Sequence, residues 1–452
     1  MKRRLWGTFA VTVLFLSGIL LAQPQVKFEQ YTLDNGLTVI LHEDHSAPLA
    51  SIMMMYHVGS KNETKGRTGF AHLFEHVMFQ GSEHVKKEEH FKLLQQVGAN
   101  VNGSTSQDRT NYFETLPSNG LELAIYLESD RMGFLLPAIS QEKLDNQRDV
   151  VKNERRQSYE NVPYGLSYET IVKALFPETH PYSWPVIGSM ADLSAASLAD
   201  VKGFFATYYA PNNACVAIAG DINPAQVKSW VQKYFGPIPR GKAFSRPQPQ
   251  EITLAADKRL VLEDRVQLPR LYLTWPSARG YTRTDAVRDV MTDILSSGKN
   301  SRLYKSLVYE KQIAQSVSAS QDGSEIAGQM SITVTAKPGK TLTEIEVAVK
   351  QVIDDLLANG VTEKEVQTSM NQKEAQLVNR RATVFGKTSA LATSYTLTGD
   401  TENINRELER FKGITPAEIL ADSHQAFATH KVVLSIVPQG KTELAAQPPA
   451  SK

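Results

Sequence analysis

The stretch TGFAHLFEHVMFQGS, residues 68–82, places His72, Glu75 and His76 within five positions. Apolar residues surround them at helical spacing, so we expect a helix over residues 68–79. Residues four apart share one helix face, and both imidazoles can therefore reach one ion. Zinc suits imidazole nitrogens, and a nearby carboxylate can take a proton from zinc-bound water. The alternative is a surface helix, but apolar neighbours indicate partial burial, where unpaired imidazoles are costly. The spacing HxxEH therefore predicts a metal site.

Strands and helices alternate irregularly on both sides of this helix. Asn35 and Gly36 accept the dihedral angles of a tight turn, which predicts a hairpin around them. We expect further strands over residues 50–58, 100–106, 110–116 and 214–219, and further helices over 86–96, 121–135, 141–160 and 199–209. The absence of a steady strand–helix–strand rhythm favours an α+β fold over a doubly wound parallel sheet.

The end of the chain repeats a pattern from its middle. A helix start at Ser197 leads into a strand that ends at Ala219, and a helix start at Thr415 leads into a strand that ends at Val437. The helix starts and the strand ends are separated by the same offset in sequence (415 − 197 = 218 and 437 − 219 = 218). An equal offset at two places predicts a duplication into two similar halves.

Composition shifts divide the chain further. The segment 237–250 contains four prolines and no apolar period, which is typical of a linker. We therefore expect an N-terminal domain over residues 26–236 and a C-terminal domain over 251–440. Residues 441–452 are expected to form a disordered tail.

The first residues have the pattern of an export signal. Lys2, Arg3 and Arg4 precede an apolar run that ends at Ala22, before a polar break. This order predicts a signal peptide over residues 1–22 and a periplasmic or extracellular protein. The run is also long enough to act as a membrane anchor if it is not cleaved.

Charge and cysteine content exclude other classes of function. The 452 residues include 49 Lys+Arg and 48 Asp+Glu, and this balance argues against a nucleic-acid binder. The single cysteine, Cys215, excludes a disulfide framework, a thiolate zinc site and a CxxC redox motif. Because Cys215 lies in an apolar run, we expect it to be a small buried hydrophobic residue.

Residues 68–76 and 79–82 resemble the active-site helix of the pitrilysin/insulinase zinc metallopeptidases. The two-part layout resembles the short-chain branch of that family, which includes mitochondrial processing peptidase. The resemblance covers nearly the whole mature chain and implies two α/β-sandwich halves of the pitrilysin-like (LuxS/metallohydrolase-like) type in a clamshell. It also implies one Zn²⁺ per chain with His72 and His76 as ligands, and Glu75 as the general base.

In this family a glutamate on a later helix is the third ligand. Glu154 has matching neighbours and follows His76 at a suitable distance in sequence (154 − 76 = 78), with Glu160 as the alternative. Either residue could instead be a solvated carboxylate paired with a neighbouring base such as Arg155. Gln147 stands where many relatives carry a second glutamate, and we assign it no catalytic role.

Residues 102–106 resemble the strand to which the family's peptide substrates add. Such addition uses main-chain hydrogen bonds at a sheet edge. The resemblance implies that Asn102 and Gly103 bind substrate, with Asn102 orienting the peptide near the metal. An ordinary polar edge strand is the alternative.

The second half lacks the metal-binding residues. Aligning residues 290–293 with residues 73–76 places no histidine in the corresponding helix. Relatives that are catalytically complete also carry an arginine and a tyrosine in a late domain, but the aligned positions here hold Val308 and Gln315. Arg302 and Tyr304 lie nearby at the wrong spacing, as ordinary helix residues would.

Together these features predict a zinc metalloendopeptidase that cleaves extended, unfolded peptides. The resemblance implies that the chain is the zinc-bearing subunit of a heterodimer with a homologous zinc-free partner. The alternatives are a self-sufficient homodimeric peptidase and a non-catalytic assembly subunit of the same family.

Overall fold

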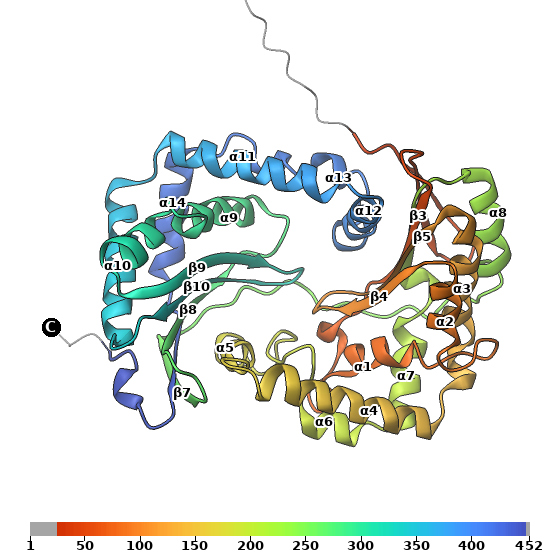
Figure 1. Ribbon diagram of the computed structural model, residues 1–452, viewed down its shortest axis with the longest axis horizontal. Coiled ribbons are helices and arrows are strands. Elements are labelled where there is room, and N and C mark those ends of the chain that lie inside the picture. Colours follow the sequence, from red (N-terminus) through yellow and green to blue (C-terminus); the bar gives the residue numbers. More distant parts are fainter. Residues whose placement is uncertain (1–24, 449–452) are drawn as a thin grey trace, which may run out of the picture.

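The computed structural model describes residues 25–448, which form two halves (Figure 1). The signal peptide expected at residues 1–22 lies outside the described residues. The first half contains β1 (Glu29–Thr32), β2 (Thr38–Glu43), β3 (Leu49–Tyr56), α1 (Phe70–Val77), α2 (Glu89–Gln96), β4 (Asn100–Thr105), β5 (Thr110–Pro117), α3 (Leu121–Ala138), α4 (Gln141–Arg155), α5 (Ser167–Leu175), α6 (Met190–Ala195), α7 (Leu198–Tyr208), β6 (Ala214–Gly220) and α8 (Pro224–Phe235). Across the described chain, no helix combines the length and apolar content needed to cross a membrane.

The second half follows the same plan. It contains β7 (Lys258–Asp264), β8 (Arg270–Ser277), α9 (Arg283–Ser296), β9 (Ala314–Gly323), β10 (Gly328–Ala336), α10 (Leu342–Asn359), α11 (Glu363–Arg380), α12 (Val384–Thr398), α13 (Asn403–Arg406), α14 (Pro416–Ala428) and β11 (Val432–Pro438). The strand order is β1-β2-β6-β3-β5-β4 in the first sheet and β7-β11-β8-β10-β9 in the second. Apart from β1 the two strand orders match. The parallel pair β2 and β6 of the first sheet corresponds to the parallel pair β7 and β11 of the second.

The repeat predicted from the sequence is confirmed. The starts of helices α7 and α14 and the ends of strands β6 and β11 are separated by the predicted offset (416 − 198 = 218 and 438 − 220 = 218). The mixture of mainly antiparallel strands with helices confirms the α+β prediction. The predicted hairpin turn is also present, with Gly36 at a φ of +91°, a value that favours glycine.

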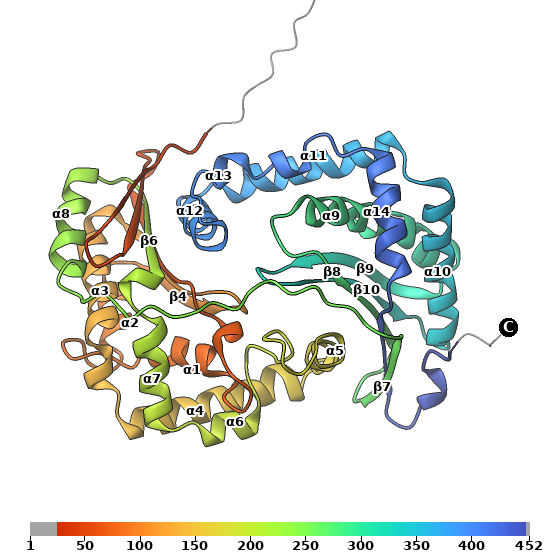
Figure 2. The same ribbon diagram turned by 180° about the vertical axis from the view of Figure 1, so that it is seen from behind.

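Each half contributes one helix that packs on the sheet of the other half (Figures 1 and 2). Helix α12 of the second half packs on the face of the first sheet that α1 and α3 leave uncovered, where Leu391 and Ala392 meet Met53 and Met55. Helix α5 of the first half packs on the second sheet, where Ile171 meets strands β8 and β11. These helices begin at nearly the same offset (384 − 167 = 217), so they are counterparts. Each half therefore covers a sheet face of the other.

Cys215 lies in the contact between α12 and the first sheet. Its side chain is buried, and burial raises the pKa of its thiol to about 12. The prediction of a small buried hydrophobic residue is confirmed.

A hairpin tip adds a polar contact between the halves. Glu325, in the turn between β9 and β10, forms an ion pair with the buried Lys61 and a hydrogen bond with His57, whose Nε2 lies 2.7 Å from its carboxylate. The backbone N–H of Glu325 also donates to Asp108 Oδ2 at 3.0 Å, in the turn that follows β4. Buried charges paired in this way fix the relative position of the two turns.

The structure adds to the sequence analysis at two places and corrects it at a third. The sequence patterns missed α5, α6 and α8 in the first half. The segment 237–250 has no helix or strand, but Arg246 binds it to the first half by donating to the His57 carbonyl at 3.0 Å. The disordered tail predicted from residue 441 is wrong as far as residue 448, because Ala445 and Ala446 are buried and the Ala446 N–H donates to Ser435 Oγ at 3.1 Å.

Candidate metal centre

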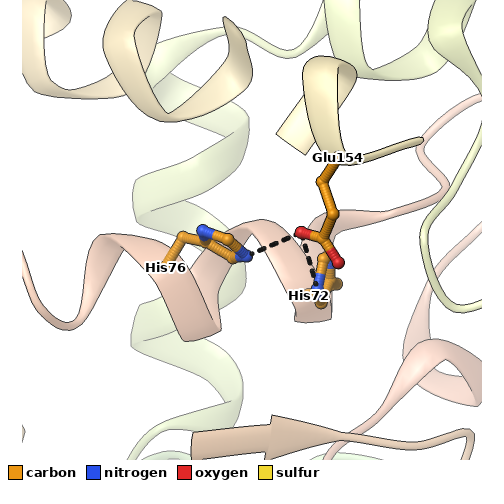
Figure 3. Close-up of side chains that lie close together, drawn as sticks. All are labelled: His72, His76 and Glu154. Atoms are coloured by element: carbon orange, nitrogen blue, oxygen red, sulfur yellow. Dashed lines mark ion pairs between the residues drawn. The ribbon is translucent and has the colours of Figure 1, made fainter. Parts of the chain in front are cut away.

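Helices α1 and α4 bring three donor groups together (Figure 3). His72 and His76 lie one turn apart on α1, with ring centroids 4.8 Å apart. The carboxylate of Glu154, on the last turn of α4, points toward both rings: its Oε2 lies 3.2 Å from His76 Nε2 and 3.7 Å from His72 Nε2. One donor atom from each residue lies within 4.8 Å of the other two.

This donor set fits a zinc ion. Two imidazole nitrogens and a carboxylate oxygen are common zinc ligands at catalytic sites. Burial and the neighbouring His76 lower the pKa of His72 to about 4, so its imidazole is neutral, the form that binds metal. A hydrogen bond with His76 holds the pKa of Glu154 below its ordinary value, so its carboxylate is ionised. The Glu154 side chain is 37% exposed, which leaves the site open to solvent.

Of the two glutamates predicted as third ligand, Glu154 is the one near the histidines. Glu160 accepts instead from Arg155 Nε at 3.1 Å. The basic residues beside Glu154 have other partners: Arg156 donates to Asn153 Oδ1, and Lys152 lies 3.9 Å from Asp149. In the structure, Glu154 is therefore not paired with a neighbouring basic residue.

Glu75 faces the edge strand β4. Its Oε2 accepts a hydrogen bond from Thr105 Oγ1 at 2.6 Å. A Cβ added at Gly103 would lie 3.2 Å from Glu75 Cγ, so glycine there leaves room for the glutamate. Burial raises the pKa of Glu75 above its ordinary value. A carboxylate with a raised pKa is suited to accept a proton and return it.

Strand alternation separates the two predicted substrate-binding residues. Gly103 and Thr105 lie two apart on one face of β4 and contact Glu75, whereas Asn102 lies on the other face and is exposed. The Asn102 side chain accepts from the Gly103 N–H at 2.8 Å. Sequence reasoning missed Thr105, although the two-residue period of the predicted strand could have placed it beside Gly103.

A buried glutamate holds the start of α1. Glu63 accepts hydrogen bonds from the backbone N–H groups of Gly69, at 2.9 Å, and Ala71, at 2.8 Å. Burial raises its pKa to about 8, against the opposing effect of these donors. Gly69 offers no side chain to cap the helix, so Glu63 satisfies N–H groups that would otherwise lack partners. Sequence reasoning missed this residue, which has no local capping pattern.

The second half has no equivalent donor set in its described helices. Helix α9 contains no histidine, as predicted. Arg302 forms a two-pronged ion pair with Glu365 of α11 and also donates to the Gly360 carbonyl at 2.9 Å. Its role there is structural, as expected for an ordinary helix residue.

Comparisons with known proteins agree with this geometry. Residues 38–180 match the family model for insulinase (peptidase family M16), and residues 195–373 match the model for the peptidase M16 inactive domain. The zinc protease PqqE of Helicobacter pylori is 26% identical over 94% of this chain and 96% of its own length. The zinc protease YmxG of Bacillus subtilis is 22% identical over 91% of this chain and 98% of its own.

A crystal structure of a protease from Helicobacter pylori has the same fold. Its TM-score is 0.84 at 24% sequence identity, with 91% of this chain and 99% of that chain covered. The insulinase model lies within the first half, the inactive-domain model runs from the end of α6 into α11 of the second half, and the shared fold extends over both halves. The chain belongs to the insulinase-type M16 peptidase family, and the domain described as inactive lies mainly in its second half.

Proposed function

We propose that the chain is a zinc-dependent endopeptidase that cleaves extended, unfolded peptides. One observation carries the proposal: His72 and His76 of α1 meet Glu154 of α4 at a partly exposed site, with Glu75 beside them. The names of the relatives PqqE and YmxG, both zinc proteases, support the choice of metal and reaction.

The residues of the site have separable tasks. His72, His76 and Glu154 would hold the zinc ion, which when bound lowers the pKa of water and polarises a peptide carbonyl. Glu75 accepts a proton from the attacking water and returns it to the leaving amine. Thr105 holds one oxygen of the Glu75 carboxylate, which limits its rotation. Strand β4 forms the outer edge of its sheet and offers main-chain groups to an extended peptide.

We further propose that the chain acts as the zinc-bearing subunit of a two-subunit peptidase after export. Val308 has no hydrogen-bond donor on its side chain, Gln315 carries no positive charge, and Arg302 is held in its ion pair with Glu365. A homologous zinc-free partner would supply the missing donors. The basic and apolar pattern of residues 1–22 supports export to the periplasm or the extracellular space, with the segment cleaved or kept as an anchor.

Metal analysis and peptide hydrolysis test the proposal. We expect about one zinc per chain, loss of hydrolysis with a chelator, and recovery when zinc is restored. Glu75→Gln should keep its zinc and lose about 10²–10⁴-fold in turnover, because only the proton acceptor is removed. Glu142→Gln, in the first turn of α4, is the control and should behave as wild type. A wild-type protein without bound zinc, or an active Glu75→Gln variant, would contradict the proposal.

Adding a purified homologous partner tests the subunit arrangement. If the site is split, hydrolysis should rise on titration and saturate at one partner per chain. Full activity of the isolated chain would favour a self-sufficient homodimer instead.

A further inference from the structure

Arg155, the residue after the proposed ligand Glu154, is buried, and its guanidinium group is hydrogen-bonded. Its side chain is 8% exposed. Each guanidinium nitrogen has a partner: Nη1 donates to the Gly188 carbonyl at 2.7 Å, Nη2 to Glu169 Oε2 at 2.7 Å, and Nε to Glu160 Oε1 at 3.1 Å. Arginine is rarely buried this deeply, and its planar fork fixes the direction of every bond it makes.

The Gly188 carbonyl belongs to a segment clamped to the start of α1. Gly188 has a φ of +75°, and a Cβ added to it would lie 2.4 Å from Gly69 Cα. The N–H of Ser189 donates to Thr68 Oγ1 at 3.0 Å, which closes the same contact from the other side. One guanidinium and one backbone contact therefore connect the helix turn that carries Glu154 with the helix that carries the two histidines.

The second partner, Glu169, connects this turn to the other half of the molecule. Glu169 lies on α5, which packs on the second sheet through residues such as Ile171. Helix α4 ends at Arg155, and residues 156–160 continue it as a π-helical turn. π-Helical turns are rare and frequently lie at functional sites.

We propose that Arg155 is a positioning residue that sets the distance between Glu154 and the pair His72 and His76. The inference rests on the proposed zinc site. Without the guanidinium, the Gly188 carbonyl and the Glu169 carboxylate lose a buried partner, and the last turn of α4 is free to shift. Glu154 then leaves the donor set, and we expect zinc affinity to fall by about 10–100-fold, as for other residues that orient metal ligands.

Arg155→Met tests this role, with Arg148→Met as the matched control. Arg148 lies two turns earlier on α4 and also ties the helix to backbone carbonyls, those of Ser194 at 3.3 Å and Ala196 at 2.9 Å. Zinc affinity is measured by competition with a chromophoric chelator, and the ligand geometry is measured from the visible absorption of the cobalt-substituted protein. The melting temperature of the metal-free protein is recorded for each variant.

The inference expects weaker zinc binding and an altered cobalt spectrum in Arg155→Met, and wild-type values in Arg148→Met whatever its melting temperature. Wild-type affinity and spectrum in Arg155→Met would overturn the inference, because a merely structural arginine would change only the melting temperature. If Arg155→Met does not fold, Arg155→Lys, which keeps the charge but not the fork, is judged by the same criterion. Absence of zinc from the wild type would instead refute the proposed function.

Discussion

Helices α1 and α4 of the first half correspond to α9 and α11 of the second, but the two pairs enclose different chemistry. At the offset that relates α5 to α12, Asp289 and Asp293 take the places of His72 and His76 (289 − 72 = 217 and 293 − 76 = 217). The two aspartates face Lys373 of α11, whose Nζ lies 2.9 Å from Asp289 and 2.8 Å from Asp293.

The side chains behind the two sites differ much less than the sites themselves. The core face of α1 carries Leu73, Phe74 and Val77, and that of α9 carries Val290, Met291 and Ile294. In the first half, two imidazoles and one carboxylate leave room for a free cation. In the second half, the carboxylates of Asp289 and Asp293 flank the ammonium group of Lys373. The candidate metal site and the internal ion pair thus differ in a few polar residues, whereas the apolar packing beneath them is similar in the two halves.

The largest expected effect follows from the removal of a proposed zinc ligand. His76→Ala removes one of two imidazole ligands, so zinc and hydrolysis should be lost together, as measured by elemental analysis and a peptide assay. His84→Ala is the control, because His84 is paired with Asp130 and lies outside the donor set. Wild-type zinc content in His76→Ala would remove His76 from the ligands.

A smaller effect is expected when the built-in cation is removed from the second half. Lys373→Met leaves Asp289 and Asp293 facing each other, and we expect a loss of about 2 kcal/mol in the free energy of unfolding, measured with urea. Zinc content should not change. Lys350→Met, which removes an exposed pair with Asp354, should cost less than about 0.5 kcal/mol. Equal stability of the two variants would show that Lys373 does not act as an internal cation.

The two edge strands differ at Thr105, whose counterpart in β9 is Gly323 (323 − 105 = 218). Substitution of Thr105 tests what its hydroxyl contributes. Thr105→Val keeps the shape of the side chain but removes the hydrogen bond to Glu75. We expect kcat to fall by about tenfold, equivalent to about 1.4 kcal/mol, with KM and zinc content unchanged. Thr105→Ser should restore kcat. An unchanged kcat in the valine variant would mean that the hydroxyl does not orient Glu75.

A pH-dependent effect is expected in the core of the first half. Strand β5 places Glu114 in the core, near Glu128, Arg131 and His90, whereas β10 has Ile332 at the corresponding place (332 − 114 = 218). Burial and the adjacent Glu128 raise the pKa of Glu114 well above its ordinary value. The folded state therefore holds a proton that the unfolded chain releases, and stability falls as pH rises above the ordinary value of 4.5.

Glu114→Gln should reduce this pH dependence, because the amide cannot ionise. We expect the slope of unfolding free energy against pH, between about pH 5 and 8, to decrease by no more than about 1.4 kcal/mol per pH unit. Both proteins are measured in the His76→Ala background, which removes pH-dependent metal binding. Identical slopes would mean that Glu114 is ionised in the folded protein.

Local patterns in the sequence predicted much of the fold and the donor set. The spacing of His72 and His76 follows from the helix period, and the hairpin at Gly36 follows from its tight-turn pair. Glu154 was predicted from family resemblance, since no local rule connects it with a histidine so far away in sequence.

The features that were missed depend on tertiary contacts. Thr105 and Arg155 gain their importance from partners on other elements, at Glu75 and at Gly188. Helix α5 packs on strands β8 and β11 of the other half, a contact that no local pattern in the sequence indicates. Ala445 and Ala446 belong to a short segment with the composition of a disordered tail, and their burial follows from the position of β11 and α10.

The reciprocal packing of α5 and α12 bears on the evolutionary origin of the molecule and on the stability of its separate halves. A single ancestral half that lent its helix to a second copy would have been a domain-swapped homodimer, and joining two such genes in tandem gives the present arrangement. Cutting the chain within residues 241–250 should therefore release no fragment under native conditions. Either piece expressed alone would present a bare apolar sheet face to water and depend on its sister for solubility.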